Sequence, residues 1–125
     1  MITGIGIDLI EIARFSQWHT WPEKKLSRIF SSIEIAYCLS SPVKSAERFA
    51  ARFAAREALF KALSSSGINI PFLTLCRQVV IQGSPPLIKI LDQELMGKLD
   101  LSCMLSLSHS ASHAIAMVVV QRVES

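Results

Sequence analysis

The 125-residue sequence predicts an α+β fold in one domain that spans residues 1–125. Three observations predict this class: an alternating segment at the N-terminus, a long helical segment in the middle, and a C-terminal half in which alternating segments are separated by turns. Half of the residues are hydrophobic and 18% are charged, which suits one core. The order of elements is one strand, then helices, then four hairpin-connected strands. This order favours antiparallel pairing, with helices on one side of the sheet.

The first predicted strand covers residues 2–10. Large apolar residues alternate there with small or polar ones, and the apolar row consists of Ile5, Ile7 and Leu9. Asp8 therefore faces away from that row, on the side of Gly4 and Gly6. Aspartate is a poor strand former, and the glycines leave space beside it. Asp8 is therefore a candidate functional residue.

Helical spacing follows the strand. Residues 11–39 predict two or three short helices, with one break at Trp21-Pro22 and another at the capping-box pattern from Ser31 to Glu34. A longer helix is predicted from about Ser41-Pro42 to about Ser65, with Gly67 as its stop signal.

Strand patterns return after Pro71. Two hairpins and a short helix are predicted, with strands at 76–82 and 87–91, a helix at 93–98, and strands at 102–109 and 114–123. The Gly-Ser-Pro-Pro turn at 83–86 joins the first hairpin.

The composition excludes several classes of protein. Lys and Arg number 13 against 10 Asp and Glu, a mild basic bias that favours acidic partners but does not indicate nucleic acid. The longest apolar stretch, residues 114–120, is too short to span a bilayer, and the N-terminus lacks a basic signal-peptide start. An RNA-binding module is disfavoured, because no RNP-like motif or GXXG loop is present. Three separated cysteines predict buried free thiols. We therefore expect a soluble cytoplasmic protein with no nucleic-acid or membrane partner.

The long helix carries a carboxylate on an apolar stripe when its residues are projected at about 100° each. The stripe consists of Ala46, Phe49, Ala50, Phe53, Phe60 and Ser64. Glu57 lies in its middle, with Lys61 one turn on. A row of arginines on the other side consists of Arg48, Arg52 and Arg56. Glu57 is thus expected where the helix meets the sheet, and a buried carboxylate needs a cation, a metal or a proton. A Glu57–Lys61 ion pair at the core margin is the alternative.

Asp8 and Glu57 come from different elements and could share one metal ion. Two carboxylates completed by water and phosphate oxygens are typical of Mg²⁺ sites. The structural alternative is that Asp8 caps the helix that begins near Glu11.

A third candidate is the Ser-Leu-Ser-His-Ser segment at residues 106–110, where a strand ends. Its hydroxyls and the His109 imidazole could bind phosphate oxygens, or His109 could act as a base near neutral pH. The alternative is a solvated turn residue.

Three segments together resemble the bacterial holo-acyl-carrier-protein synthases, the small trimeric class of 4'-phosphopantetheinyl transferases. They are GIGIDLIEIAR at 4–14, RFAAREALFKAL at 52–63 and SLSHS at 106–110. The resemblance implies that family's fold, Mg²⁺ as cofactor, and transfer of the phosphopantetheine arm of coenzyme A (CoA) to a serine of apo-acyl carrier protein. It also implies a role in fatty acid biosynthesis.

The resemblance also implies roles for individual residues. Asp8 and Glu57 would hold Mg²⁺, and the proposed catalytic residues are Glu57, Lys61 and His109. The CoA phosphates would be bound by Lys61, Arg52, Ser108 and His109. Either Glu57 or a metal-bound water would accept the serine proton. Family members usually carry lysine where this chain has Arg56, which puts a phosphate contact there in doubt.

The implied carrier-protein substrate is strongly acidic, and Arg14 and Arg28 are the predicted docking residues. The same segment contributes further basic and aromatic candidates, namely Trp18, Trp21, Lys24, Lys25 and Phe30, with a solvated face and core aromatics as the alternative. A homotrimer with sites at subunit boundaries is implied by the family, and the apolar strand at 114–123 suits a face covered by a neighbour. A catalytically inactive CoA- or nucleotide-binding trimer is the rival hypothesis. The intact Asp8, Glu57 and Lys61 argue against it.

Overall fold

The computed structural model describes residues 1–92 and 100–123 and has the predicted α+β architecture. Its elements in chain order are β1 (Ile2–Glu11), the 3₁₀ helices η1 (Ile12–Phe15) and η2 (Trp18–Thr20), α1 (Glu23–Leu26), α2 (Ser32–Leu39), α3 (Ser45–Ser65), α4 (Phe72–Arg77), β2 (Val79–Gln82), β3 (Leu87–Ile90), β4 (Leu101–His109) and β5 (His113–Arg122).

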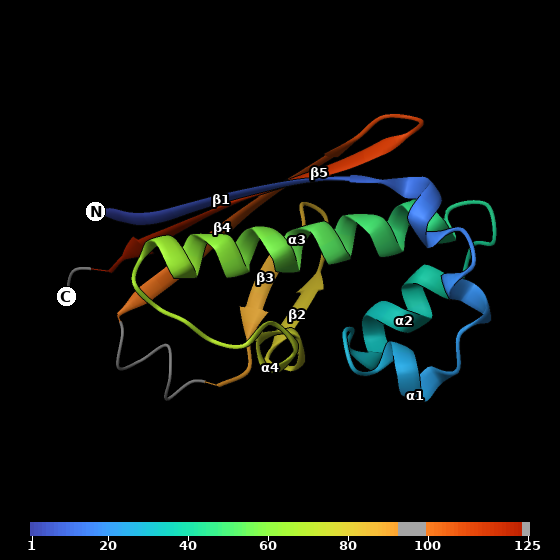
Figure 1. The fold of residues 1–125 in the computed structure, drawn as a ribbon, viewed down its shortest axis with the longest axis horizontal. Coiled ribbons are helices and arrows are strands. Elements are labelled where there is room, and N and C mark those ends of the chain that lie inside the picture. Colours follow the sequence, from blue (N-terminus) through green and yellow to red (C-terminus); the bar gives the residue numbers. More distant parts are fainter. Residues whose placement is uncertain (93–99, 124–125) are drawn as a thin grey trace.

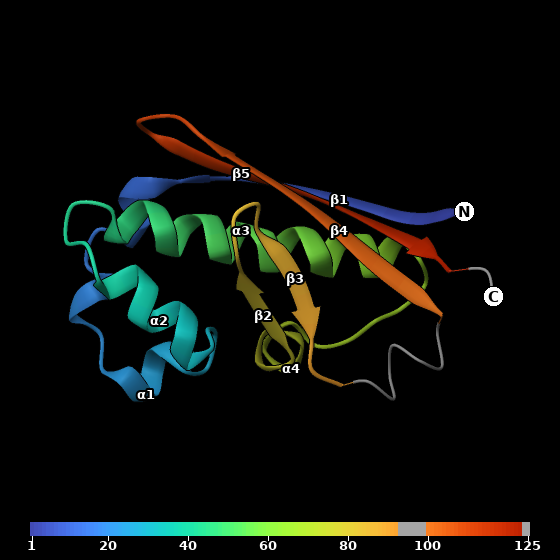
Figure 2. The ribbon, with the colours of Figure 1, turned by 180° about the vertical axis from the view of Figure 1, so that it is seen from behind.

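The strands form two antiparallel sheets. The larger sheet has the order β1-β5-β4, and β2 pairs with β3 in a separate two-stranded sheet. Asp8 of β1 is opposite Ala116 of β5, which in turn is opposite Leu107 of β4. The helices lie on one side of the three-stranded sheet, as Figures 1 and 2 show from opposite directions. Antiparallel pairing, both hairpins and the one-sided placement of the helices are therefore confirmed, whereas the strands are divided between two sheets.

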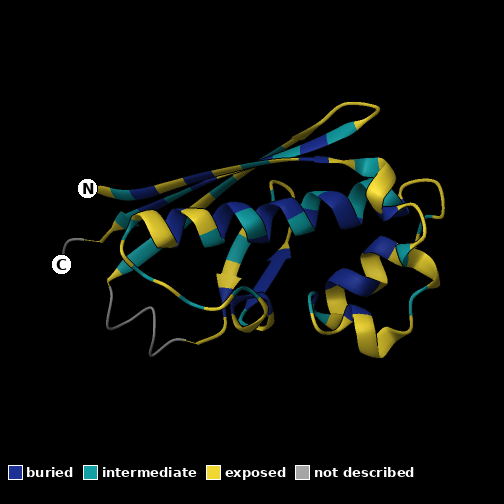
Figure 3. Ribbon diagram, in the orientation of Figure 1, coloured by how far each residue is buried: buried dark blue, intermediate teal, exposed yellow. Residues whose placement is uncertain are grey.

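The helix α3 approaches the sheet through its alanines. A Cβ on Gly6 would overlap the carbonyl oxygen of Ala58, and one on Gly4 would overlap that of Ala62. The absence of side chains on these glycines therefore lets the helix lie directly on β1. The expectation that the phenylalanine stripe meets the sheet is wrong, because small residues are needed at this contact. Figure 3 shows the resulting band of buried residues along α3.

The phenylalanines of α3 instead pack against aromatic rings of η1, of α4 and of the segment between α1 and α2. Phe49 lies 5.2 Å from Phe30, and Phe53 lies 5.5 Å from Phe15 and 5.7 Å from Phe72, measured between ring centroids. Phe60 also contacts the ring of Phe72. The large side chains thus fill the space on the side of the helix away from the sheet.

Several local predictions are confirmed and others need correction. Ser31 caps α2 by accepting a hydrogen bond from the Glu34 amide, and Gly67 follows α3 with φ of +85°. The long helix begins at Ser45, after a turn, rather than at Ser41-Pro42. The strand predicted from residue 76 begins only at Val79, because Pro71 initiates α4 instead. The helix predicted at 93–98 lies outside the described residues.

The three cysteines are free, with Cys38 and Cys76 buried and Cys103 half-buried. Burial raises the pKa of Cys38 to about 12 and the pKa values of Cys76 and Cys103 to about 11. The prediction of buried free thiols is therefore confirmed for Cys38 and Cys76, whereas Cys103 is free but only half-buried. In the described part of the chain, none of the helices combines the length and apolar character needed to cross a membrane.

The face of the sheet opposite α3 is apolar and open to solvent in a single chain. Ile5, Ile7 and Leu9 are 59%, 55% and 64% exposed, and Met104 and Met117 continue the same face on the neighbouring strands. The alternation in β1 is thus confirmed, but its apolar row points away from the core. A contiguous apolar face of this kind is typical of an interaction surface.

Candidate functional site

Asp8 and Lys61 are in direct contact where β1 crosses α3. The Lys61 Nζ donates hydrogen bonds to Asp8 Oδ1 at 3.1 Å and to the Ile7 carbonyl at 3.0 Å. The Asp8 side chain is 16% exposed, whereas that of Lys61 is 50% exposed. Because Asp8 lies two residues beyond Gly6, it shares the side of the strand that the glycines open to the helix. The close strand–helix approach therefore brings this pair together.

Glu57 lies beside this pair, at the margin of the helix–sheet contact. Burial raises the pKa of its carboxyl, and the negative charge of Asp8 raises it further. Lys61 and Arg14 act in the opposite direction. The structure thus brings Asp8, Glu57 and Lys61 together, as expected, and adds Arg14 to their surroundings. The alternative in which Asp8 caps the following helix is not seen, since η1 has no side-chain cap.

The donor set at this junction fits Mg²⁺. In the described residues no group of three His, Cys, Asp or Glu side chains could hold a metal on its own. Mg²⁺, however, commonly uses only one or two carboxylates and takes its other ligands from water and phosphates. Asp8 and Glu57 supply two carboxylates whose negative charges repel each other. A divalent cation bound between them would remove this repulsion.

A second cluster surrounds His109 at the end of β4. Its Nε2 lies 3.1 Å from Glu47 Oε1 on α3. A cavity of about 290 Å³ beside it is lined by residues that include Lys44, Arg48, Arg52, Ser108 and His109. Three cationic side chains and an imidazole surround this cavity against one carboxylate, that of Glu47, and this excess of positive charge can bind an anion such as phosphate. The structure therefore brings together Arg52, Ser108 and His109 of the predicted CoA-binding set, whereas its fourth member, Lys61, lies at the junction with Asp8.

Within one chain, the two clusters are separated. Asp8 lies on β1 and His109 on β4, the two outer strands of the sheet, with β5 between them. On α3, Arg52 and Glu57 project about 140° apart around the helix axis at about 100° per residue. The predicted catalytic set of Glu57, Lys61 and His109 is therefore not assembled by a single chain.

The predicted docking residues Arg14 and Arg28 are both exposed. The aromatic residues near them are less available than expected. Phe30 is buried in the core, and Trp18 and Trp21 are half-buried and stack on each other with centroids 4.0 Å apart. Phe30 is therefore wrong as a docking anchor. Its ring is needed to cover Phe49 and Trp18.

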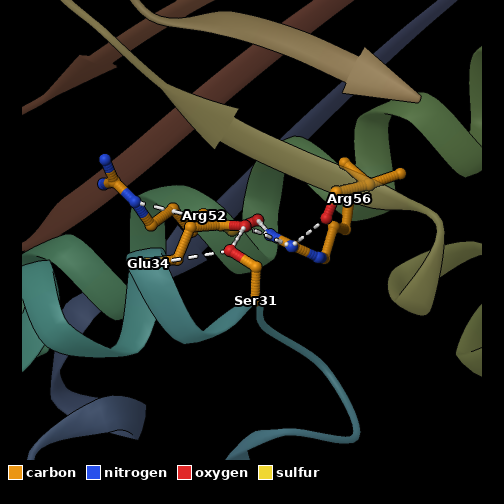
Figure 4. Close-up of polar contacts among 5 residues, drawn as sticks. Ser31, Glu34, Arg52 and Arg56 are labelled. Carbon is orange, nitrogen blue, oxygen red and sulfur yellow. Dashed lines mark hydrogen bonds and ion pairs between the residues drawn. The ribbon is translucent and has the colours of Figure 1, made fainter. Parts of the chain in front are cut away.

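Sequence reasoning missed a buried ion pair between α2 and α3. The Arg56 Nη1 and Nη2 donate to Glu34 Oε2 and Oε1 at 2.8 and 2.7 Å, and Nη2 also donates to the Val79 carbonyl at 2.9 Å (Figure 4). Both charged side chains are fully buried. Arg56 therefore points into the protein rather than toward a ligand, and the placement of the arginine row away from the core is wrong. The capping pattern identified Glu34, but only as a helix signal.

Comparison with known proteins relates this geometry to a family. The family model for the 4'-phosphopantetheinyl transferase superfamily matches residues 4–118. A curated relative, the holo-[acyl-carrier-protein] synthase of Geobacter sp. (strain M21), is 40% identical over 129 residues that cover 98% of this chain and 100% of the relative.

Solved structures of similar proteins share the fold. The holo-(acyl-carrier-protein) synthase from Bacillus anthracis in complex with CoA (3',5'-ADP) has a TM-score of 0.75 and 27% identity, covering 98% of this chain and 99% of that one. The Helicobacter pylori holo-[acyl-carrier-protein] synthase in complex with coenzyme A has a TM-score of 0.72 and 36% identity, covering 94% and 99%. The fold implied by the sequence resemblance is thereby confirmed. Because the family model spans most of the sequence and the similarity to the relatives extends from end to end, this chain belongs to the 4'-phosphopantetheinyl transferase superfamily.

Proposed function

We propose that this protein is a holo-[acyl-carrier-protein] synthase, which transfers the 4'-phosphopantetheine group of CoA to a serine of apo-acyl carrier protein and releases adenosine 3',5'-bisphosphate. One observation carries the proposal: Lys61 contacts Asp8 beside Glu57 at a glycine-lined strand–helix junction. The similarity to proteins of that name along the whole chain supports it.

The chemistry is phosphoryl transfer. The serine oxygen forms a bond to the phosphorus that carries the pantetheine arm, and the bond from that phosphorus to the bridging oxygen of the pyrophosphate breaks. The electron pair leaves with adenosine 3',5'-bisphosphate. Such reactions depend mainly on positioning and charge neutralisation. The Lys61 ammonium, half-exposed beside Asp8, is suited to bind a pyrophosphate oxygen.

Glu57 is suited by its position to accept the serine proton, since it lies beside Asp8 and Lys61. Asp8 and Glu57 are also the residues that would hold Mg²⁺, by the fit of their oxygen donors. Mg²⁺ bound there would neutralise negative charge on the pyrophosphate.

The cluster around His109 is proposed to bind the phosphate oxygens of CoA that Lys61 does not contact. Arg52 and Ser108 line the same cavity as His109, with Lys44 and Arg48 as further cations. The separation of this cluster from Asp8 within one chain supports a site completed between subunits. We propose a homotrimer, in which the exposed apolar face around Ile7 and Met117 is covered by neighbouring copies. The number three comes from the family resemblance.

Arg14 and Arg28 are proposed to bind the acidic carrier protein, because both are exposed and Arg14 lies near enough to Glu57 to lower its pKa. A carrier docked at Arg14 would thus present its serine near the reacting groups. We further propose that the reaction supports fatty acid biosynthesis and takes place in the cytoplasm, a reducing compartment that suits three free thiols.

The test is incubation of the protein with apo-acyl carrier protein, CoA and Mg²⁺, followed by mass spectrometry of the carrier. The expected result is a phosphopantetheine adduct on one serine and formation of adenosine 3',5'-bisphosphate. CoA binding without any adduct would overturn the proposed transferase activity. It would favour the rival hypothesis of an inactive CoA-binding trimer.

A further inference from the structure

The helix α2 holds each arginine of the row on α3 by a different contact. The Arg48 Nη1 donates to the Tyr37 carbonyl at 2.8 Å and to Ser40 Oγ at 3.0 Å, at the C-terminal end of α2. Arg56 is bound by both oxygens of Glu34. Between them, the Arg52 Nε lies 3.9 Å from Glu34 Oε2. All three guanidinium groups are therefore contacted from α2 or its C-terminal end, and Arg56 also donates to the Val79 carbonyl of β2.

Glu34 is the shared anchor of two of these arginines. Its side chain is fully buried, and Oε1 also accepts a hydrogen bond from the Ser31 hydroxyl at 2.9 Å. The same Oε2 that binds Arg56 is the oxygen that faces Arg52 (Figure 4). One carboxylate thus faces two guanidinium groups, and one positive charge remains uncompensated within this cluster.

That uncompensated charge belongs to Arg52. Its side chain is 11% exposed, and its buried Nε has no hydrogen-bond partner among the described residues. The guanidinium lies over the Tyr37 ring, 4.4 Å from the centroid, and Arg52 lines the cavity that also contains Ser108 and His109. With Nε turned toward Glu34, the terminal nitrogens point away from the carboxylate (Figure 4). Arg52 is thus oriented before any ligand binds.

We propose that Glu34 is a positioning residue that orients Arg52 to bind a phosphate group of CoA. The proposal rests on the proposed function, because it assigns the ligand of Arg52 as CoA. Glu34 itself is buried and does not touch the ligand. It acts through the orientation of Arg52, as carboxylates behind a binding site orient the side chains that touch the ligand in other proteins.

The experiment separates positioning from stability by removing the buried pair as a unit. Glu34→Leu combined with Arg56→Leu replaces a buried ion pair with apolar side chains, a change that proteins commonly tolerate, whereas either change alone leaves a buried charge. CoA affinity is measured by calorimetry on the full chain and stability by thermal unfolding. We expect CoA to bind about tenfold more weakly, the loss of about one charge-assisted hydrogen bond, with an unchanged KM for carrier protein.

Arg52→Leu provides a double-mutant cycle. If Glu34 acts through Arg52, the paired leucine variant loses no further CoA affinity once Arg52 is absent. Additive losses would show an indirect structural effect and overturn the proposal. Arg56→Lys is the matched control, because it keeps a cation for Glu34, and its CoA affinity should remain within about twofold of the wild-type protein.

Two further outcomes are decisive. If the leucine pair does not fold, Glu34→Asp replaces it, since this variant keeps the charge but withdraws the carboxylate from Arg52 by one methylene. A folded variant of either kind that binds CoA like the wild-type protein would overturn the positioning role and leave the proposed function intact. A wild-type protein that binds neither CoA nor adenosine 3',5'-bisphosphate would instead overturn the proposed function, and the role of Arg52 with it.

Discussion

Gly6 of β1 lies against Ala58 of α3 so closely that a Cβ on Gly6 would overlap the Ala58 carbonyl oxygen. This contact fixes the separation between the strand and the helix beside the Asp8–Lys61 pair. The two elements run in opposite directions, because Gly4 lies against Ala62 and Gly6 against Ala58, so the long Lys61 side chain reaches Asp8 past the Gly6–Ala58 contact. The distance of 3.1 Å between Lys61 Nζ and Asp8 Oδ1 therefore depends on a residue without a side chain.

Gly6→Ala should consequently reduce both stability and activity. The added methyl group forces α3 away from β1, and overpacking of this kind costs about 1–3 kcal/mol of the free energy of unfolding. We expect phosphopantetheine transfer to fall more than the folded fraction does, because Lys61 and Glu57 move away from Asp8. Denaturant unfolding and initial transfer rates measure the two effects.

Gly67→Ala is the control for this prediction. It also costs about 1 kcal/mol, because Gly67 has a φ of +85°, but nothing lies within 4 Å of the added carbon. Its activity per folded molecule should equal that of the wild-type protein. A fully active Gly6→Ala protein would contradict the dependence on close approach.

Asp8→Asn and Glu57→Gln should each abolish metal-dependent transfer without unfolding the protein. Each change removes a negative charge that Mg²⁺ requires, and losses of at least about 100-fold are expected for groups that stabilise transition-state charge. Activity as a function of Mg²⁺ concentration and far-UV circular dichroism provide the measurements. Glu23→Gln, an exposed carboxylate in the first turn of α1, should leave both unchanged. Full activity of both site variants after chelator treatment would remove the metal site from the mechanism.

The pKa of Glu57 should respond to its two neighbours in opposite directions. In metal-free protein its carboxyl titrates above the usual range of glutamate, because of burial and the charge of Asp8. Asp8→Asn should lower this pKa, and Lys61→Met should raise it. Carboxyl ¹³C chemical shifts of Glu57 recorded against pH measure both effects. Shifts in the same direction would contradict the electrostatic coupling.

The same pKa shift has a consequence for stability. A carboxyl whose pKa is higher in the folded than in the unfolded state binds more protons when folded, between these two pKa values. Its contribution to stability therefore decreases as pH rises through that window, which begins near 4.5 and extends upward. Mg²⁺ binding, which requires the carboxylate, should strengthen over the same window.

The sequence predicted the part of the candidate site around Asp8, Glu57 and Lys61 better than its surroundings. Asp8 followed from strand alternation beside two glycines, and Glu57 with Lys61 followed from helical spacing. Strand alternation and helical spacing depend only on residues close together in the sequence, so they can be identified without the tertiary structure. Which side of α3 meets the sheet was not predictable from hydrophobicity, because the contact at Ala58 depends on small size rather than on apolar character.

The Glu34–Arg56 pair was hidden for a related reason. Both residues carry charges that normally indicate solvent exposure, and their contact joins positions 22 residues apart. Only the tertiary structure reveals that each supplies the other's missing counter-charge. The strand predicted from residue 76 failed because a short apolar segment suits either a helix or a strand, and Pro71 initiated a helix.

Arg14→Glu should impair recognition of the carrier protein more than CoA binding. Arg14 is exposed on η1, and its charge lowers the pKa of the Glu57 carboxyl. An acidic partner bound at Arg14 would therefore lie close to the reacting groups. The charge reversal should raise the KM for carrier protein and weaken its dependence on salt concentration. Steady-state kinetics at several ionic strengths measure this. Arg77→Glu, an exposed arginine at the end of α4, is the charge-matched control. A defect confined to CoA would point to another docking surface.

The open apolar face of the sheet predicts self-association. Ile5, Ile7 and Leu9 are each more than half exposed, and Met117 lies among them on the central strand. Met117→Lys places a charge at the centre of this face and, if the proposed trimer forms, should convert it to monomers in analytical ultracentrifugation. Leu87→Lys on the separate small sheet, where the side chain is also exposed, should leave the oligomeric state of the wild-type protein unchanged.

Activity of mixed oligomers tests whether each site is shared between subunits. A cavity of about 230 Å³ lined by Leu9, Ser108 and His109 borders the apolar face, so a copy that covers this face would lie next to His109. If that copy supplies Asp8, a site between an Asp8→Ala chain and a His109→Ala chain can contain both intact residues. Mixing the two inactive proteins under exchange conditions should then restore part of the activity. If each chain instead used its own His109 and Asp8, no mixture could recover activity, and a fully active monomeric Met117→Lys protein would refute the shared site directly.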